Sequence, residues 1–287
     1  MFKILNETFR TGIVTTRYPQ AAAKVAEGFR GLPRIDFSAW HDALPAATAC
    51  PTGAIAVKDR GGLRDVTVDF GLCVFCGLCA EATPEGAVRI TQEFELAVEH
   101  RQELIVLAQY SLNPDGSHRN LASLRSGTAA DEPAAERAGR KLKEKISAIL
   151  GRSLAIREVD AGSCNGCELE IHSLNNPIYD IERFGIHFVA SPRHADMLLV
   201  TGPVTRNMEI ALKKTYLATP DPRLVVAVGA CGISGGIFGR NYASLGGVDQ
   251  VIPVDVYIPG CPPRPQALLQ GILMAIGCMQ QTLHLDV

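Results

Sequence analysis

The strongest constraint on this chain is the arrangement of its cysteines. Cys73, Cys76 and Cys79 recur at every third position in the stretch CVFCGLC, but Thr83 stands where the next cysteine is expected, before a proline. An earlier stretch, CPTGAIAV, places Cys50 directly before a proline. Clustered cysteines in a chain without secretory features are more often metal ligands or redox groups than disulfide partners. These four cysteines therefore indicate a metal site assembled from two parts of the chain.

The two stretches align as copies of one duplicated motif. Iron–sulfur proteins that hold two clusters repeat C-x2-C-x2-C-x3-C-P, and the fourth cysteine of each copy binds the cluster of the other copy. Counting back from Cys50 by this spacing gives the three other ligand positions of the first copy, which are Trp40, Ala43 and Ala46. Thr83 replaces the fourth ligand of the second copy. One ligand set is therefore missing and the other is complete, which predicts one [4Fe–4S] cluster on Cys50, Cys73, Cys76 and Cys79.

Two other interpretations of this cysteine set stay open. A decayed domain would hold no metal, although random loss of ligands rarely leaves one whole set. Zinc also binds four cysteines, but zinc sites usually pair their cysteines two by two. A triple at x2 spacing with a remote Cys-Pro favours the cluster.

Apolar, strand-like runs in the second half of the chain each end in a loop that carries cysteine. LAIREV precedes Cys164 and Cys167, RLVVAVG precedes Cys231, and VYIPG leads to Cys261. These runs and ADMLLVTG alternate with helical stretches, which indicates a parallel sheet covered on both faces. Because ligands of open α/β sheets bind outside the carboxyl ends of the strands, we expect the four cysteines to converge on one spot.

Glycines surround the third cysteine of this group, in GACGISGGIFG. A thiolate-bound cluster is large and anionic, and glycines allow backbone N–H groups to approach its sulfurs. The glycines expected to do so are Gly229, Gly232, Gly235 and Gly236. Nucleotide binding is the rival interpretation, but the chain has no P-loop signature and GACGISGG differs from GxGxxG. A four-cysteine zinc site and a redox CxxC pair also stay open, although the CxxC pair leaves Cys231 and Cys261 without a role.

Length and composition set the wider frame. A chain of 287 residues with 47% hydrophobic side chains indicates about two domains. A net charge of −2 with scattered Lys and Arg gives no basis for nucleic-acid binding. The N-terminus, MFKILNETFRTGIV, lacks the apolar core of a signal peptide, and the uncharged run 265–285 contains glutamines and glycines. We expect a cytoplasmic chain without a transmembrane segment, in which 265–285 is a buried helix.

The domain organisation is predicted as residues 1–110, a joint at 111–150, and residues 151–287. The joint begins with a Ser-, Asn- and Gly-rich linker that contains a Pro-Asp-Gly turn signal. A helix is expected from Pro133, with apolar residues on one face, until Gly151 ends it.

Several residues with reactive side chains are given structural roles. Cys278 is expected to be a buried thiol in the C-terminal helix. His172, His187 and His194 show no ligand spacing. Glu168 and Glu170 follow the CxxC pair and are interpreted as capping or pairing carboxylates, with a proton relay towards a partner as the alternative.

The N-terminal region resembles a known family. The stretches FRTGIVTTRYP, GFRGLPRIDF and CVFCGLC…ITQEFELAV resemble the ferredoxin-type subunits of formate hydrogenlyase and of complex I, over roughly residues 1–110. The resemblance implies an α+β, bacterial ferredoxin-like domain. Such subunits typically carry two clusters, whereas the ligands here serve one.

The C-terminal region resembles a second family. The stretches DAGSCNGCELEI, YDIERFGI, SPRHADMLLVTGPVT, GACGISGGIFG and IPVDVYIPGCPPRP resemble the small subunit of membrane-bound [NiFe] hydrogenases of the formate hydrogenlyase type, and the complex I subunit nearest quinone. They cover roughly residues 153–278. Complex I subunits have adjacent cysteines at the first ligand site, whereas Cys164 and Cys167 have the hydrogenase spacing. The resemblance implies a flavodoxin-like α/β domain with the proximal [4Fe–4S] cluster on Cys164, Cys167, Cys231 and Cys261.

Together the two resemblances imply an electron-relay subunit with two [4Fe–4S] clusters in a cytoplasm-facing, membrane-associated hydrogenase. The implied partners are a large subunit with the [NiFe] centre, membrane-arm subunits, and an electron donor, either a formate dehydrogenase module or a ferredoxin. A quinone-reducing or nickel-free relative and a zinc-stabilised scaffold are the alternatives. We further hypothesise that fusing the two domains holds the remaining clusters close together and so shortens the electron-transfer path between them.

Overall fold

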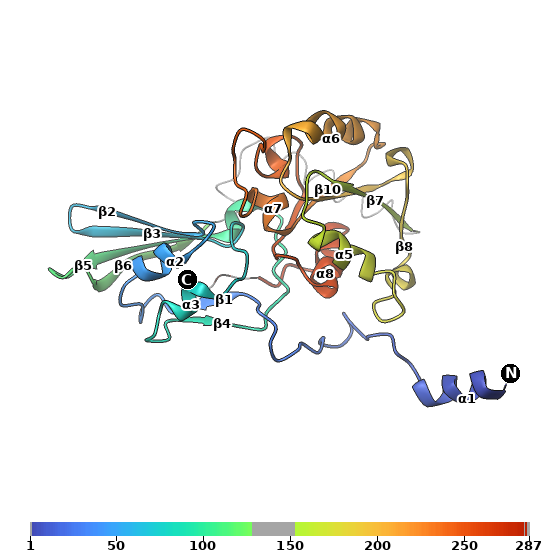
Figure 1. Ribbon diagram of the computed structural model, residues 1–287, viewed down its shortest axis with the longest axis horizontal. Helices are drawn as coiled ribbons and strands as arrows, with labels where there is room; N and C mark the ends of the chain where they lie inside the picture. Colours follow the sequence, from blue (N-terminus) through green and yellow to red (C-terminus); the bar gives the residue numbers. More distant parts are fainter. Residues whose placement is uncertain (1, 128–152, 284, 286–287) are drawn as a thin grey trace.

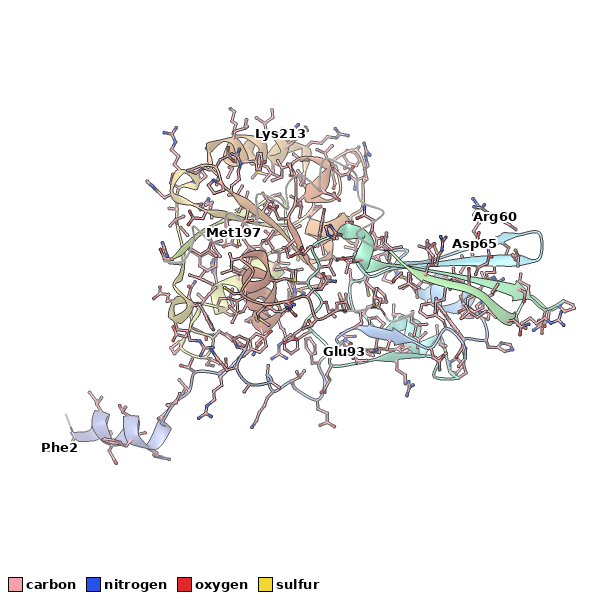
Figure 2. The ribbon with its side chains drawn as sticks, turned by 180° about the vertical axis from the view of Figure 1, so that it is seen from behind. Phe2, Arg60, Asp65, Glu93, Met197 and Lys213 are labelled. Atoms are coloured by element: carbon pink, nitrogen blue, oxygen red, sulfur yellow. The ribbon has the colours of Figure 1, made fainter. Side chains whose placement is uncertain are left out.

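The chain folds into two lobes that lie side by side in Figure 1. The computed structural model describes residues 2–127, 153–283 and 285. Helix α1 (Phe2–Thr11) projects away from both lobes, and the side chains of Phe2 and Phe9 are 88% and 84% exposed (Figures 1 and 2). The helix predicted from Pro133 lies outside the described residues.

The N-terminal lobe is built from antiparallel strands and short helices. Its elements are β1 (Pro33–Ile35), α2 (Leu44–Ala49), β2 (Ile55–Arg60), β3 (Leu63–Asp69), α3 (Leu78–Glu81), β4 (Val88–Ile90), the 3₁₀ helix η1 (Arg101–Leu104), β5 (Ile105–Leu112) and β6 (His118–Ser126). β2, β3, β5 and β6 form one antiparallel sheet in that order, and β1 pairs with β4. Val66, Val68 and Val106 are buried on one face of the sheet, which packs into the core.

The structure differs from the predicted linker at residues 111–126, which belong to this sheet. β5 and β6 form a hairpin, and the carboxylate of Asp115 accepts a hydrogen bond from the backbone N–H of Ser117 in its loop, at 2.9 Å. The Pro-Asp-Gly turn signal is therefore the tip of a hairpin. The strand β6 is hidden in the sequence because most of its residues are polar or half-exposed, without a clear apolar alternation.

The C-terminal lobe is a parallel sheet covered by helices. Its elements are β7 (Leu154–Asp160), α5 (Gly166–Ser173), η3 (Ile181–Phe184), β8 (Ile186–Phe188), η4 (Pro192–His194), β9 (Met197–Thr201), α6 (Arg206–Ala218), β10 (Leu224–Val228), α7 (Gly229–Ser234), η5 (Val248–Gln250), β11 (Val256–Ile258) and α8 (Pro265–Ala275). The strand order is β11-β10-β9-β7-β8 and every pair is parallel. This is the flavodoxin-type order, with a topological switch between β7 and β9. The flavodoxin-like prediction for this lobe is confirmed.

The C-terminal helix is buried but shorter than predicted. All residues of α8 are buried, and the helix ends at Ala275. Gly277 then adopts a φ of +74°, and Cys278 lies exposed beyond the helix. The prediction of a buried Cys278 is wrong because a glycine in the left-handed region ends the helix before it. In the described part of the chain, no helix is long and apolar enough to cross a membrane.

Backbone and side-chain contacts join the two lobes. Val98 and Tyr257 form an antiparallel bridge with hydrogen bonds of 3.0 and 2.9 Å. The backbone N–H of Ala97 donates to the side-chain oxygen of Gln270 at 3.3 Å, in a buried position. One hydrophobic cluster includes Val66 of the N-terminal lobe together with Val200 of the C-terminal sheet. The core is therefore continuous across the junction.

Candidate metal centres

Four cysteines of the N-terminal lobe line one cavity. Cys50 directly follows α2, Cys73 and Cys76 lie in the loop between β3 and α3, and Cys79 lies in α3. All four line the same cavity, with apolar neighbours such as Ile35. We call Cys50, Cys73, Cys76 and Cys79 the N set. The structure thus brings together the two parts of the chain that the sequence motif predicts to act as one site.

Burial, neighbouring thiols and hydrogen bonds shift the pKa values of cysteines in the N set. Burial, and then the neighbouring thiols, raise the pKa of Cys73 to about 12, and burial raises the pKa of Cys79. Burial also acts on Cys50, but N–H groups of Thr52, Ala54 and Ile55 and the Thr52 hydroxyl together lower its pKa. The Ala54 N–H donates to the Cys50 sulfur at 3.2 Å. Thiols crowded in this way hold protons in the metal-free chain and release them when a metal binds.

A second group of cysteines meets at the carboxyl ends of three parallel strands. Cys164 and Cys167 follow β7, Cys231 lies in α7 directly after β10, and Cys261 follows β11. Burial, and then Glu168 and the other three thiols, raise the pKa of Cys167. Burial, Cys261 and Cys164 raise the pKa of Cys231 to about 11. Contacts agree with these mutual effects: a Cβ on Gly166 would lie 3.5 Å from the Cys164 sulfur and 3.9 Å from Pro262, the residue after Cys261. We call Cys164, Cys167, Cys231 and Cys261 the C set.

Two of the predicted glycines contact sulfur directly. A Cβ atom on Gly229 would lie 2.8 Å from the Cys167 sulfur, and one on Gly236 would lie 2.7 Å from the Cys231 sulfur. Both glycines have positive φ, of 76° and 53°. Gly232 and Gly235 instead approach backbone atoms, those of Val200 for Gly232 and those of Gly239 and Gly246 for Gly235. Two of the four glycines therefore lie against cysteine sulfurs and two against backbone atoms, and their role around a cluster stays a prediction.

Both CxxC segments contain one non-glycine residue with positive φ. Phe75 lies between Cys73 and Cys76 with a φ of 56°, and Asn165 lies between Cys164 and Cys167 with a φ of 70°. Non-glycine residues adopt this left-handed conformation rarely, and such outliers concentrate at functional sites.

The donor sets fit an iron–sulfur cluster. The N set offers four thiols from two parts of the chain, with backbone N–H groups donating to the sulfurs of Cys50 and Cys73. The C set offers four thiols from three parts of the chain, with two glycines against sulfur where any Cβ would collide. Within residues 2–127, 153–283 and 285, no three His, Cys, Asp or Glu side chains gather closely enough to hold a single metal ion. His172, His187 and His194 accordingly join no such group.

The positions at which the predicted duplicated motif lacks cysteines hold packed side chains. Trp40, Ala43, Ala46 and Thr83 are all buried, with exposures of 2% or less. The Trp40 ring packs edge-on against Phe37 and against His118, whose ring stacks on Tyr110 at 3.8 Å. His118 and Tyr110 belong to the β5–β6 hairpin. The hairpin that replaces the predicted linker therefore covers the place of the missing site.

The two thiol sets lie next to each other across the junction of the lobes. The charge of Cys76 raises the pKa of Cys261, after burial and Cys164. The Ser234 hydroxyl, three residues after Cys231, lies 2.9 Å from the Gly71 carbonyl oxygen, two residues before Cys73. Cys76 and Cys261 also line one open cleft, to which Glu93, labelled in Figure 2, contributes.

Glu168 does not have the structural role expected from the sequence. It is buried, and both carboxylate oxygens lack a hydrogen-bond partner within the described residues. Glu170 lies within electrostatic range of Arg264, although burial dominates and raises its pKa. Arg264 and Ser234 are residues of the junction that sequence patterns did not single out. The only signal for Arg264 is its place in CPPRP, three residues after a ligand.

A parallel sheet that delivers four thiols to one end defines a metal-binding subunit of the α/β type. The family model described as NADH ubiquinone oxidoreductase, 20 Kd subunit, matches residues 164–275. Formate hydrogenlyase subunit 7 of Escherichia coli is 50% identical over 143 residues, which are 50% of this chain and 56% of that protein. The probable membrane-bound hydrogenase subunit mbhJ of Pyrococcus furiosus is 47% identical over 48% of this chain and 84% of its own length. An NADH-quinone oxidoreductase subunit of Bacteroides thetaiotaomicron is 51% identical over 39% of this chain and 57% of its own length.

The chain belongs to this 20 Kd subunit family. The resemblance to hydrogenase small subunits and to the complex I subunit is confirmed, and the relatives are subunits of oxidoreductases. Members of the family bind an iron–sulfur cluster. The chain spans about half the length of the E. coli relative, and the family match leaves residues 1–163 uncovered.

Gly236→Ala tests whether the C set needs a glycine beside the Cys231 sulfur in order to hold a cluster. The new methyl group collides with the Cys231 sulfur, so we expect the variant to lose about four iron atoms per chain. Gly239→Ala is the matched control, because Gly239 lies in the same loop with a φ of +59° but has nothing within 4 Å of the added carbon. Iron analysis of both variants decides the matter: equal iron in the two proteins contradicts this requirement.

Trp40→Ala tests whether packing has replaced the missing site. Loss of the buried indole is expected to destabilise the N-terminal lobe by about 3 kcal/mol, because it leaves a cavity. Native-state hydrogen exchange at β3 and β5 measures this locally. Leu44→Ala, at a 42% exposed position nearby, should change stability by no more than about 0.5 kcal/mol. A Trp40 variant as stable as the Leu44 variant would refute the packing role.

Proposed function

We propose that this chain is the electron-relay subunit of a membrane-associated [NiFe] hydrogenase complex. The N set and the C set each hold a [4Fe–4S] cluster, which takes up and releases one electron at a time. The chain's own residues bind the clusters and hold them close together. No substrate bond is made or broken in this chain.

The adjacency of the two thiol sets is the observation that carries the proposal. Cys76 of one set and Cys261 of the other share a cleft, and the charge of Cys76 acts on the pKa of Cys261. The Ser234–Gly71 contact ties the loop after Cys231 to the loop before Cys73. A protein that only stabilised its fold with metal would have no need to face two sites towards each other, whereas an electron relay does.

The N-terminal lobe is proposed to be a ferredoxin-like module that has kept one of two clusters. The retained set is the one that faces the C-terminal lobe, and the missing positions are closed by Trp40 and the β5–β6 hairpin. This supports the hypothesis that fusing the two domains shortens the electron-transfer path between the clusters. We propose residues 1–110 with the hairpin as the first module, and residues 151–287 as the second.

The surface around the C set is proposed to receive the large subunit. Cys164 and Cys261 are exposed, and exposed apolar side chains lie on the neighbouring α5 and on the loop after α7. These side chains are Leu169, Ile237, Phe238 and Tyr242. Exposed apolar side chains near a proposed cofactor site are consistent with a protein interface. An electron donor, a formate dehydrogenase module or a ferredoxin, would approach the N-terminal lobe, and membrane-arm subunits would hold the complex at the inner face of the cell membrane.

A quinone-reducing or nickel-free complex is the second candidate. The 51% identity to an NADH-quinone oxidoreductase subunit favours it. Cys164 and Cys167, separated by two residues, favour the hydrogenase. Both candidates include electron relay by the two thiol sets. They differ in whether the partner subunit contains nickel.

Cys76→Ala and Cys231→Ala test the two ligand sets independently. Each variant is expected to lower the iron content of the anaerobically purified complex by about four atoms per chain, because each removes one thiol from a different cluster. Cys278→Ala is the control and should leave iron unchanged, since that thiol belongs to neither set. If both variants remove the same iron, or if zinc replaces iron in the unchanged protein, the two-cluster proposal fails.

A further inference from the structure

We propose that Arg264 is a positioning residue that fixes how closely the N set and the C set face each other. The consequence for electron transfer rests on the proposed function, but the contact itself does not. Arg264 belongs to the C-terminal lobe and directly precedes α8, three residues after Cys261.

The guanidinium of Arg264 contacts two segments that connect the lobes, one before β1 and one after β4, and the second carries Phe94, which packs against the hydrophobic cluster of the C-terminal lobe. It lies over the ring of Phe94 at 4.8 Å and over the ring of Phe29 at 5.2 Å. One nitrogen donates to the backbone oxygen of Lys24 at 3.3 Å, and Nε donates to Gln266, within its own lobe, at 2.9 Å. Three of these four partners, Phe94, Phe29 and Lys24, are distant from Arg264 in the sequence, and Phe29 is the one next to a residue that contacts the N set.

One partner of Arg264, Phe29, is adjacent in the chain to a residue that contacts the N set. Arg30 follows Phe29 in the chain and donates from Nη1 to the backbone oxygen of Cys76 at 2.6 Å. A short path of contacts thus runs from Cys261 through Arg264, Phe29 and Arg30 to Cys76. Both ends of this path line the same open cleft, of about 480 Å³, together with Arg264, Phe29 and Arg30.

The chemistry of the contact requires arginine. A planar guanidinium can stack on two aromatic faces while its N–H groups donate in its own plane, whereas an ammonium is a point charge without a flat face. The bridge between Val98 and Tyr257 and the bond between Ala97 and Gln270 hold the lobes elsewhere along the junction. Removing the Arg264 side chain should therefore leave the lobes joined while loosening the edge that carries Cys76 and Cys261.

Arg264→Ala in the intact complex tests this role. With both clusters reduced, magnetic splitting between them falls steeply with their separation, so we expect the splitting to be lost while the iron content stays unchanged. Hydrogen exchange at the Phe29 amide, which donates to Ala26 at 3.0 Å, is expected to accelerate. Arg264→Lys should fail to restore the splitting, because lysine keeps the charge but not the stacking.

Arg223→Ala is the matched control. Arg223 stacks on Tyr216 at 4.3 Å and donates to two backbone oxygens, but all its partners lie within the C-terminal lobe. It should change neither splitting nor exchange at Phe29. Phe29→Leu removes one ring from the other side and should reproduce the loss if Arg264→Ala does not assemble.

These measurements test the positioning role of Arg264 separately from the proposed electron-relay function. Unchanged splitting and exchange in the Arg264→Ala protein would overturn the positioning role, as would full rescue by lysine. If the unchanged protein contains only one cluster, the two-cluster function fails, and the exchange measurement alone then decides the role of Arg264.

Discussion

The crowding of thiols in half-buried pockets is the constraint on which this structure depends. Four thiolates in a pocket of low dielectric repel one another, and burial raises the pKa of Cys73, Cys167 and Cys231. Such an arrangement is stable only with its thiols protonated or with a cationic metal centre among them. The backbone N–H groups near sulfur and the glycines at 229 and 236 are features that favour the metal-bound state.

The junction between the lobes follows from the same constraint. Each thiol set combines loop cysteines with cysteines of short helices, and the loops need support from neighbouring rigid elements. Three features supply that support: the bridge between Val98 and Tyr257, the shared core, and the contact between Ser234 and Gly71. In the N-terminal lobe, Trp40 packs against His118 of the β5–β6 hairpin, at a position where the predicted motif lacks a cysteine. The N set and the C set both line one cleft, through Cys76 and Cys261.

Much of the site was predictable because cysteine spacing and strand order carry strong local information. The ligand motif identified the N set, and buried apolar strands predicted where Cys164, Cys231 and Cys261 would meet. The β5–β6 hairpin was not predictable, because β6 is held by pairing with β5 rather than by an apolar pattern of its own. The exposure of Cys278 depends on one glycine conformation after α8. The role of Arg264 depends on contacts with Phe29 and Phe94, which are distant in sequence and carry no shared pattern.

Metal analysis of the native complex is the most direct test of the account. The complex would be purified without oxygen through a tag on this chain, and nickel, iron and zinc would be measured in the same fractions. The account predicts stoichiometric nickel, about eight iron atoms attributable to this chain, and no zinc at the thiol sets. Iron without nickel would keep the electron relay but contradict the hydrogenase assignment. Zinc in place of iron would contradict the relay itself.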